Sequence, residues 1–227
     1  MSSATKDLTF WSRDLGKNVT LLLCFMPPSP DMLVNQFPVA WKVVTLSATG
    51  ESVLDVTVAS QLGFCMPQIG GGQNTRILSA GCYTAINNGE TTTLEVTIPT
   101  EPPVYSFTPP VPFAESKSVQ AKNDTGSVAP IALGLVYGMG TSRQIISPIL
   151  AWPSIAQGTS IETDFTPILR VYIAQDYQES EIIKADIQEA RLIWEANVAH
   201  LGPKTRIHIV NNGDSGFAVR TTPYQRE

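Results

Sequence analysis

The stretch TVASQLGFCMPQI, residues 57–69, and a later stretch, DFTPILRVYIAQD, residues 164–176, decide the fold. Both place an apolar residue at nearly every second position, and both reach a glutamine at the same step, Gln68 in the first and Gln175 in the second. Alternation with a period of two is typical of a β-strand that buries one of its faces. The similarity of the two stretches leads to the hypothesis that the chain contains one unit twice.

The similarity extends in both directions from these stretches. A shift of 107 positions matches Leu54 with Ile161, Asp55 with Glu162, Val58 with Phe165, Phe64 with Val171 and Met66 with Ile173. Upstream, a shift of 110 carries the turn at residues 14–16 onto residues 124–126. Downstream, a shift of 113 carries Leu94 onto Ile207. Turn residues meet turn residues and apolar residues meet apolar residues, which predicts two similar antiparallel β-modules from an internal duplication.

Short alternating segments cover most of the chain. In ETTTLEVTIP, residues 90–99, Leu94, Val96 and Ile98 alternate with polar or charged side chains. Clusters of Gly, Asn and Asp, such as ATGE and NNGE, separate the segments, as turns separate strands. Many short strands at such spacing predict an all-β fold of two tandem β-sandwich-like modules.

The stretch TEPPVYSFTPPVPFAES, residues 100–116, interrupts the alternation with five prolines. Proline lacks a backbone N–H and is excluded from interior strands, so this stretch is expected to be extended. We therefore predict a proline-rich linker at residues 101–117, between a first β-module at 7–100 and a second at 118–224.

At most one or two short helices are expected. Residues 29–37 begin with Ser29, a good helix N-cap. Residues 188–201 fit a helix and a strand equally well, because Leu192 and Trp194 also satisfy a period of two.

Composition excludes several classes of protein. The net charge of −5 is mild and the basic residues are scattered, so the basic patch of a nucleic-acid binder is missing. No apolar run approaches the roughly 20 residues of a transmembrane segment. Cys24, Cys65 and Cys82 have no CxxC or Cys/His spacing, so no metal and no cofactor are expected. Thiols in apolar strands are usually small buried hydrophobes, and we expect a reducing, cytoplasmic location.

The sequence contains no recognisable catalytic constellation. Its two histidines are His200 and His208, and alternation with Ile207 and Ile209 points His208 away from the core. Acidic residues are denser in the second half, and Asp176 and Glu179 could act as acid and base in a pocket between the modules. An enzyme of this kind is the second hypothesis for function.

The favoured hypothesis is a non-enzymatic binding protein that presents strand-end loops to a glycan, a lipid surface or a small polar ligand. Aromatic rings beside carboxylates or carboxamides suit sugar rings, although the same aromatics could instead pack in the core. The predicted ligand-binding residues are Asp176, Tyr177, Glu179, Trp194 and Tyr105. A self-assembling structural protein, with homo-oligomers, is the third hypothesis.

Overall fold

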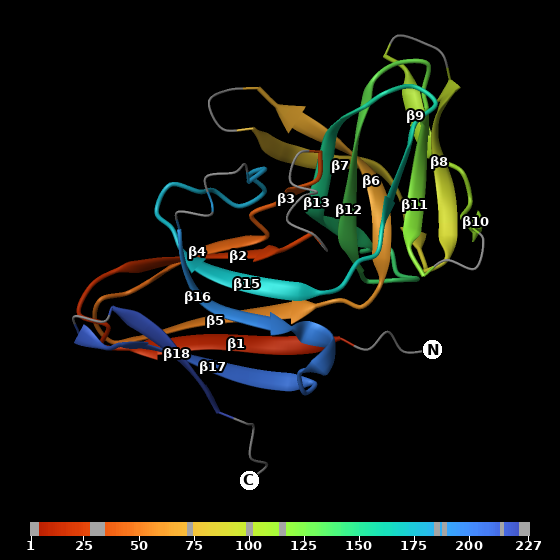
Figure 1. Ribbon diagram of the computed structural model, residues 1–227. Helices are drawn as coiled ribbons and strands as arrows, with labels where there is room; N and C mark the ends of the chain where they lie inside the picture. Colours follow the sequence, from red (N-terminus) through yellow and green to blue (C-terminus); the bar gives the residue numbers. More distant parts are fainter. Residues whose placement is uncertain are drawn as a thin grey trace.

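The computed structural model describes residues 5–27, 35–71, 75–98, 102–113, 117–183, 187, 190–213 and 216–222. Within them the chain is built from strands with no α-helix, which confirms the all-β class. The strands form four sheets, and these pack in pairs as two β-sandwiches whose strands run across one another (Figure 1). A 3-10 turn covers Val198–His200.

The terminal sandwich combines the two ends of the chain. Its sheets have the strand orders β18-β17-β1-β5 and β16-β15-β2-β4. The strands are β1 (Lys6–Arg13), β2 (Val19–Phe25), β4 (Lys42–Leu46), β5 (Glu51–Val58), β15 (Ile168–Ile173), β16 (Arg191–Asn197), β17 (Lys204–Asn211) and β18 (Phe217–Thr222).

The central sandwich contains the remaining strands. Its sheets have the orders β10-β8-β11-β14, with β9 also on β8, and β3-β13-β12-β6-β7. The strands are β3 (Phe37–Pro38), β6 (Leu62–Gly70), β7 (Arg76–Ile86), β8 (Glu90–Ile98), β9 (Val104–Phe107), β10 (Val111–Pro112), β11 (Val119–Asp124), β12 (Ala129–Tyr137), β13 (Ile145–Ile155) and β14 (Ser160–Thr163).

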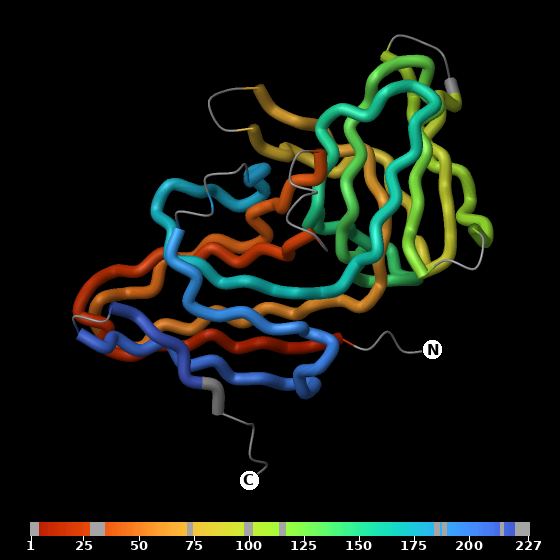
Figure 2. Tube along the Cα trace, viewed as in Figure 1, coloured from red at the N-terminus to blue at the C-terminus, as the bar shows by residue number. Residues whose placement is uncertain are grey.

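The sheets do not follow the expected division into modules at residues 7–100 and 118–224. Both sandwiches contain strands from both parts of the chain (Figure 2). The described part of the expected linker, 101–117, forms β9 and β10 beside β8 instead of joining the sandwiches. Of its prolines only Pro112 lies in one of these strands, the short edge strand β10, where backbone positions without a ladder hydrogen bond tolerate proline. The chain crosses between the sandwiches at residues 59–61 and again at residues 164–167.

The two sandwiches have the same strand pairings. In the terminal sandwich, β1 is parallel to β17 and antiparallel to β5. In the central sandwich, β11 is parallel to β8 and antiparallel to β14. The opposing sheets agree as well, since β2 lies between β15 and β4 as β12 lies between β6 and β13. Strands β6–β9 therefore hold, in the central sandwich, the places that β15–β18 hold in the terminal one.

Individual rungs of the ladders match in the same way. Leu23 on β2 faces Val171 on β15, and Leu133 on β12 faces Phe64 on β6. Phe64 and Val171 are separated by 107 positions, the shift used in the sequence comparison, and Leu23 and Leu133 by 110. The matched positions therefore lie in opposite sandwiches, and apart from the two-residue strands β3 and β10 each half of the chain contributes four of the described strands to each sandwich.

One continuous apolar core joins the two sandwiches. Phe25 is fully buried, and its ring lies 5.2 Å from that of Trp41 and 5.9 Å from that of Phe165. Phe165 belongs to the second crossing segment, so the crossing itself is packed into the core. Removing Phe25 should therefore affect both sandwiches.

Burial in the structure defines the role of two of the thiols. Cys24 and Cys65 are fully buried among apolar side chains, which confirms that they act as small hydrophobes. Burial raises the pKa of each thiol to about 12.

Of the ambiguous residues 188–201, the described part forms β16 and the 3-10 turn. Of the other expected helix, at 29–37, residues 29–34 lie outside the described residues.

Candidate ligand-binding face

The candidate site is the outward face of the sheet formed by β5, β1 and β17 in the terminal sandwich. On β1, Leu8 and Phe10 are buried, so alternation turns Asp7, Thr9 and Trp11 outward. The neighbouring strands behave in the same way, with buried Val56 and Ile207 alternating with outward polar side chains. Three strands far apart in the sequence thus bring one polar face together.

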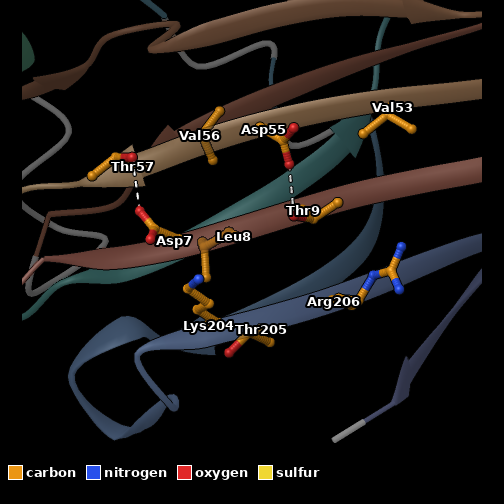
Figure 3. Close-up of a pocket in the computed structure, with 10 residues that line it drawn as sticks. All are labelled: Asp7, Leu8, Thr9, Val53, Asp55, Val56, Thr57, Lys204, Thr205 and Arg206. Atoms are coloured by element: carbon orange, nitrogen blue, oxygen red, sulfur yellow. Dashed lines mark hydrogen bonds between the residues drawn. The ribbon is translucent and has the colours of Figure 1, made fainter. Parts of the chain in front are cut away.

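A hollow of about 510 Å³ lies on this face (Figure 3). It is lined by Asp7, Leu8, Thr9, Val53, Asp55, Val56, Thr57, Lys204, Thr205 and Arg206. Two rungs of the sheet cross it: Thr57, Asp7 and Lys204 form one, and Asp55, Thr9 and Arg206 form the next. The hollow is therefore a property of the strand register.

Both carboxylates in the hollow are held by threonines. Thr9 Oγ1 donates a hydrogen bond to Asp55 Oδ1 at 2.6 Å, and Thr57 Oγ1 donates to Asp7 Oδ1 at 2.9 Å (Figure 3). Within the described residues, the second oxygen of each carboxylate receives no hydrogen bond. A carboxylate accepts several hydrogen bonds, so each aspartate can still accept from a ligand.

The cations of the hollow are also available to a ligand. Among the residues that the structure describes, none carries a carboxylate within ion-pair distance of Lys204 or Arg206. Two carboxylates and two cations give the hollow a balanced charge together with both donors and acceptors. This arrangement suits a neutral ligand with many hydroxyl groups better than a strongly charged one.

An aromatic pair occupies the next rung. Trp11 stacks on His208 with ring centroids 3.8 Å apart and an interplanar angle of 6°. The guanidinium of Arg206 lies 5.9 Å from the centroid of the Trp11 ring. Partial burial and the nearby charge of Arg220 lower the pKa of His208. This shift favours the neutral imidazole. The outward position of His208 agrees with the orientation expected from alternation.

The five predicted ligand-binding residues are not brought together. Trp194, on β16, packs edge-on against buried Phe10 with ring centroids 5.8 Å apart. Tyr105, on β9 of the other sandwich, packs against the apolar core. These two aromatics thus have the core-packing role that the sequence left open.

The other three residues lie in the segment after β15. Tyr177 packs on a second apolar cluster outside the β2–β15 sheet, and Asp176 is exposed. Glu179 is held in an ion pair with Lys42, whose Nζ lies 2.6 Å from its carboxylate. None of the three lines the hollow on β5, β1 and β17.

Sequence reasoning missed the residues of this face. Asp7, Thr9 and Trp11 alternate with apolar neighbours, and this pattern could have marked them as outward-facing. Their convergence with Asp55 and Arg206 could not be seen, because it depends on β1 pairing with both β5 and β17.

Comparisons with known proteins found no match: no family model, no curated protein and no solved structure is significantly similar to the chain. No group of three or more possible metal ligands occurs in the described part of the chain. None of the helical segments in the described residues is long and apolar enough to span a membrane.

Proposed function

We propose that this protein is a non-enzymatic binding protein that recognises a glycan through the outward face of β5, β1 and β17. The observation that carries the proposal is the hollow itself, where two hydrogen-bond-accepting carboxylates lie with two cations that form no ion pair among the described residues, beside a stacked Trp–His pair. Sugar hydroxyls both donate and accept hydrogen bonds, so each type of group in the hollow has a partner on a sugar.

The chemistry assigns a role to each side chain. Asp7 and Asp55 accept hydrogen bonds from hydroxyl groups, and Thr9 and Thr57 hold these carboxylates in place. Arg206 donates to ring or hydroxyl oxygens. Trp11 lies on the rung beside the hollow with one ring face stacked on His208, so a sugar reaches its remaining apolar surface with C–H groups.

We also propose that the two sandwiches derive from one duplicated unit, on the basis of their matching strand pairings. The central sandwich then serves as an internal reference for what the fold needs. At the positions of Asp55, Thr9 and Arg206 it carries Glu162, Gln120 and Thr91, and at those of Val53, Trp11 and His208 it carries Ser160, Lys122 and Thr93. This register matches Leu94 with Ile209, a shift of 115, and not with Ile207 at the shift of 113 expected from the sequence. The fold is thus built without an aromatic pair at these rungs, which favours a functional role for the pair in the terminal sandwich.

A glycan array tests the proposal. The wild-type protein is expected to bind a defined set of neutral glycans, and Trp11→Ala and Arg206→Ala are each expected to weaken binding at least tenfold, about 1.4 kcal/mol. Lys122→Ala is the matched control, because it changes the equivalent rung of the central sandwich and should leave binding unchanged. Circular dichroism checks that each variant is folded.

Two results would contradict the proposal. One is an array of neutral and acidic glycans on which the wild-type protein binds nothing. The other is glycan binding that survives the double variant Trp11→Ala/Arg206→Ala, which would move the site away from this face.

A cytoplasmic location is proposed from the thiols. All three cysteines are free: Cys24, Cys65 and Cys82. An oxidising compartment favours disulfides, so free thiols favour a reducing one such as the cytoplasm. Mass measurement of the protein isolated under alkylating conditions tests this, with three alkylated cysteines expected after denaturation.

A further inference from the structure

A second hollow lies where the chain crosses between the sandwiches. Its volume is about 430 Å³, within the roughly 300–1,000 Å³ typical of small-ligand sites. It is lined by Lys6, Val58, Ala59, Ser60, Leu62, Asn88, Leu135, Phe165, Pro167, Val198 and Ala199. Both crossing segments take part: Val58 and Phe165 are equivalent positions at a shift of 107, as are Ser60 and Pro167.

The walls of this hollow are mainly aliphatic. Leu62 and Leu135 pair on adjacent strands at its base, and Val58, Phe165 and Val198 add further apolar surface. Burying apolar surface contributes about 25 cal/mol for each Å² removed from water. An apolar chain therefore fits this hollow better than a sugar does, which separates it from the polar face on β5, β1 and β17.

The charge of the lining has one sign. Lys6 is its single ionisable residue, since Asp and Glu are absent from the lining. Lys6 Nζ donates one hydrogen bond to the carbonyl of Leu201 at 2.5 Å, and within the described residues no carboxylate lies at ion-pair distance. An ammonium has three N–H donors, so two remain for a ligand.

We propose that this hollow binds a single-chain fatty acid, with the alkyl chain among the aliphatic side chains and the carboxylate on Lys6. Asn88, in the turn before β8, carries a side-chain amide and is a further polar residue of the lining. The assignment is independent of glycan recognition, because the two hollows share no lining residue.

Titration calorimetry of the full chain with decanoate, below its micelle concentration, tests the proposal. The wild-type protein is expected to bind decanoate with a negative heat-capacity change, the mark of buried apolar surface. It should bind uncharged decanol at least tenfold more weakly, because hydrogen bonds between charged partners are stronger than those to a neutral hydroxyl.

Two variants locate the ligand. Lys6→Met keeps an unbranched side chain of similar length and removes its charge, so the preference for decanoate over decanol should disappear. Ala199→Trp places a large ring in the hollow from an exposed position and should abolish binding of both ligands without unfolding the chain. Lys204→Met, in the other hollow, is the matched control and should bind decanoate as the wild type does.

The proposal is overturned if decanoate does not bind at millimolar concentration, or if binding is the same in Lys6→Met and Ala199→Trp as in the wild type. Equal binding of decanoate and decanol by the wild type would overturn the role of Lys6. Loss of glycan binding on the array would leave these outcomes unaffected, so the two proposals fail separately.

Discussion

Replacing Phe25 by alanine should destabilise both sandwiches together. Phe25 lies on β2 of the terminal sandwich, is fully buried and contacts both Trp41 and the crossing residue Phe165. Its cluster includes buried side chains of β6, β12 and β13 in the central sandwich. A cavity at this position therefore removes contacts from a core that the two sandwiches share.

The magnitude follows from the burial. Phe→Ala in a core costs about 3–5 kcal/mol, and two aromatic contacts are lost here, so we expect the upper half of that range, about 4–5 kcal/mol. For a chain of this size, each kcal/mol lowers the melting temperature by roughly 2–4 °C. The expected fall is therefore on the order of 8–20 °C. Val53 is half-exposed, so Val53→Ala is the matched control. This change should alter the free energy of unfolding by less than about 0.5 kcal/mol.

Hydrogen exchange measured peptide by peptide is the assay. If the core unfolds as one unit, the slowest amides of β12 in the central sandwich and of β15 in the terminal sandwich exchange through the same global opening. Phe25→Ala should then accelerate both by the same factor, roughly a thousandfold for about 4 kcal/mol. Wild-type exchange in β12 together with faster exchange in β15 would refute a shared core.

Three further predictions concern single residues. Cys24 and Cys65 should not react with a thiol reagent at pH 8 until the chain is denatured, because burial raises the pKa of each to about 12; rapid reaction of either in the folded protein would contradict this. Asn123→Ala should lower the free energy of unfolding in urea by about 3 kcal/mol, because the buried carboxamide donates to two backbone carbonyls and accepts from Thr125; a loss under about 1 kcal/mol would argue against this network. The pKa of His208 is lower in the folded chain than in the unfolded one, so the unfolded chain binds a proton first as the pH falls below about 6.5. The free energy of unfolding should therefore decline on acidification below that pH. In urea titrations at several pH values, His208→Gln should show a weaker decline. An unchanged pH profile in the variant would remove His208 as its source.

The strands were predictable because alternation is a local signal. The pattern of Leu94 and Val96 against polar neighbours identifies β8 without any knowledge of its partner. The order of equivalent strands was likewise readable from the matched turns and apolar residues. Residues 188–201 were ambiguous because a short apolar run satisfies both periods, and the pairing of β16 with β15 decided for a strand.

The choice of partner strand was not predictable. Strand β1 pairs with β17. Strand β8, which holds the place of β17 in the central sandwich, pairs with β11. Both strands show the same alternation, so either would bury the same face. Short connections at residues 59–61 and 164–167 carry the chain onward into the other sandwich. On the proposed duplication this arrangement is an exchange of strands between two copies, which short hinge loops favour. The polar face near Trp11 was missed for the same reason, since it exists only in the exchanged arrangement.

Paired cysteines test this exchange most directly. Thr9 on β1 and Arg206 on β17 are partners on adjacent strands. Adjacent strands lie about 4.8 Å apart, so the two Cα atoms are within reach of a disulfide. The two cysteines are introduced into a variant whose native cysteines have been replaced. Thr9→Cys/Arg206→Cys should therefore form an intramolecular disulfide under mild oxidation, seen as a mass loss of about 2 Da, whereas Thr9→Cys/Thr91→Cys should remain reduced. Without exchange β1 would pair with β8, and a disulfide in the second variant but not the first would contradict the interleaved fold.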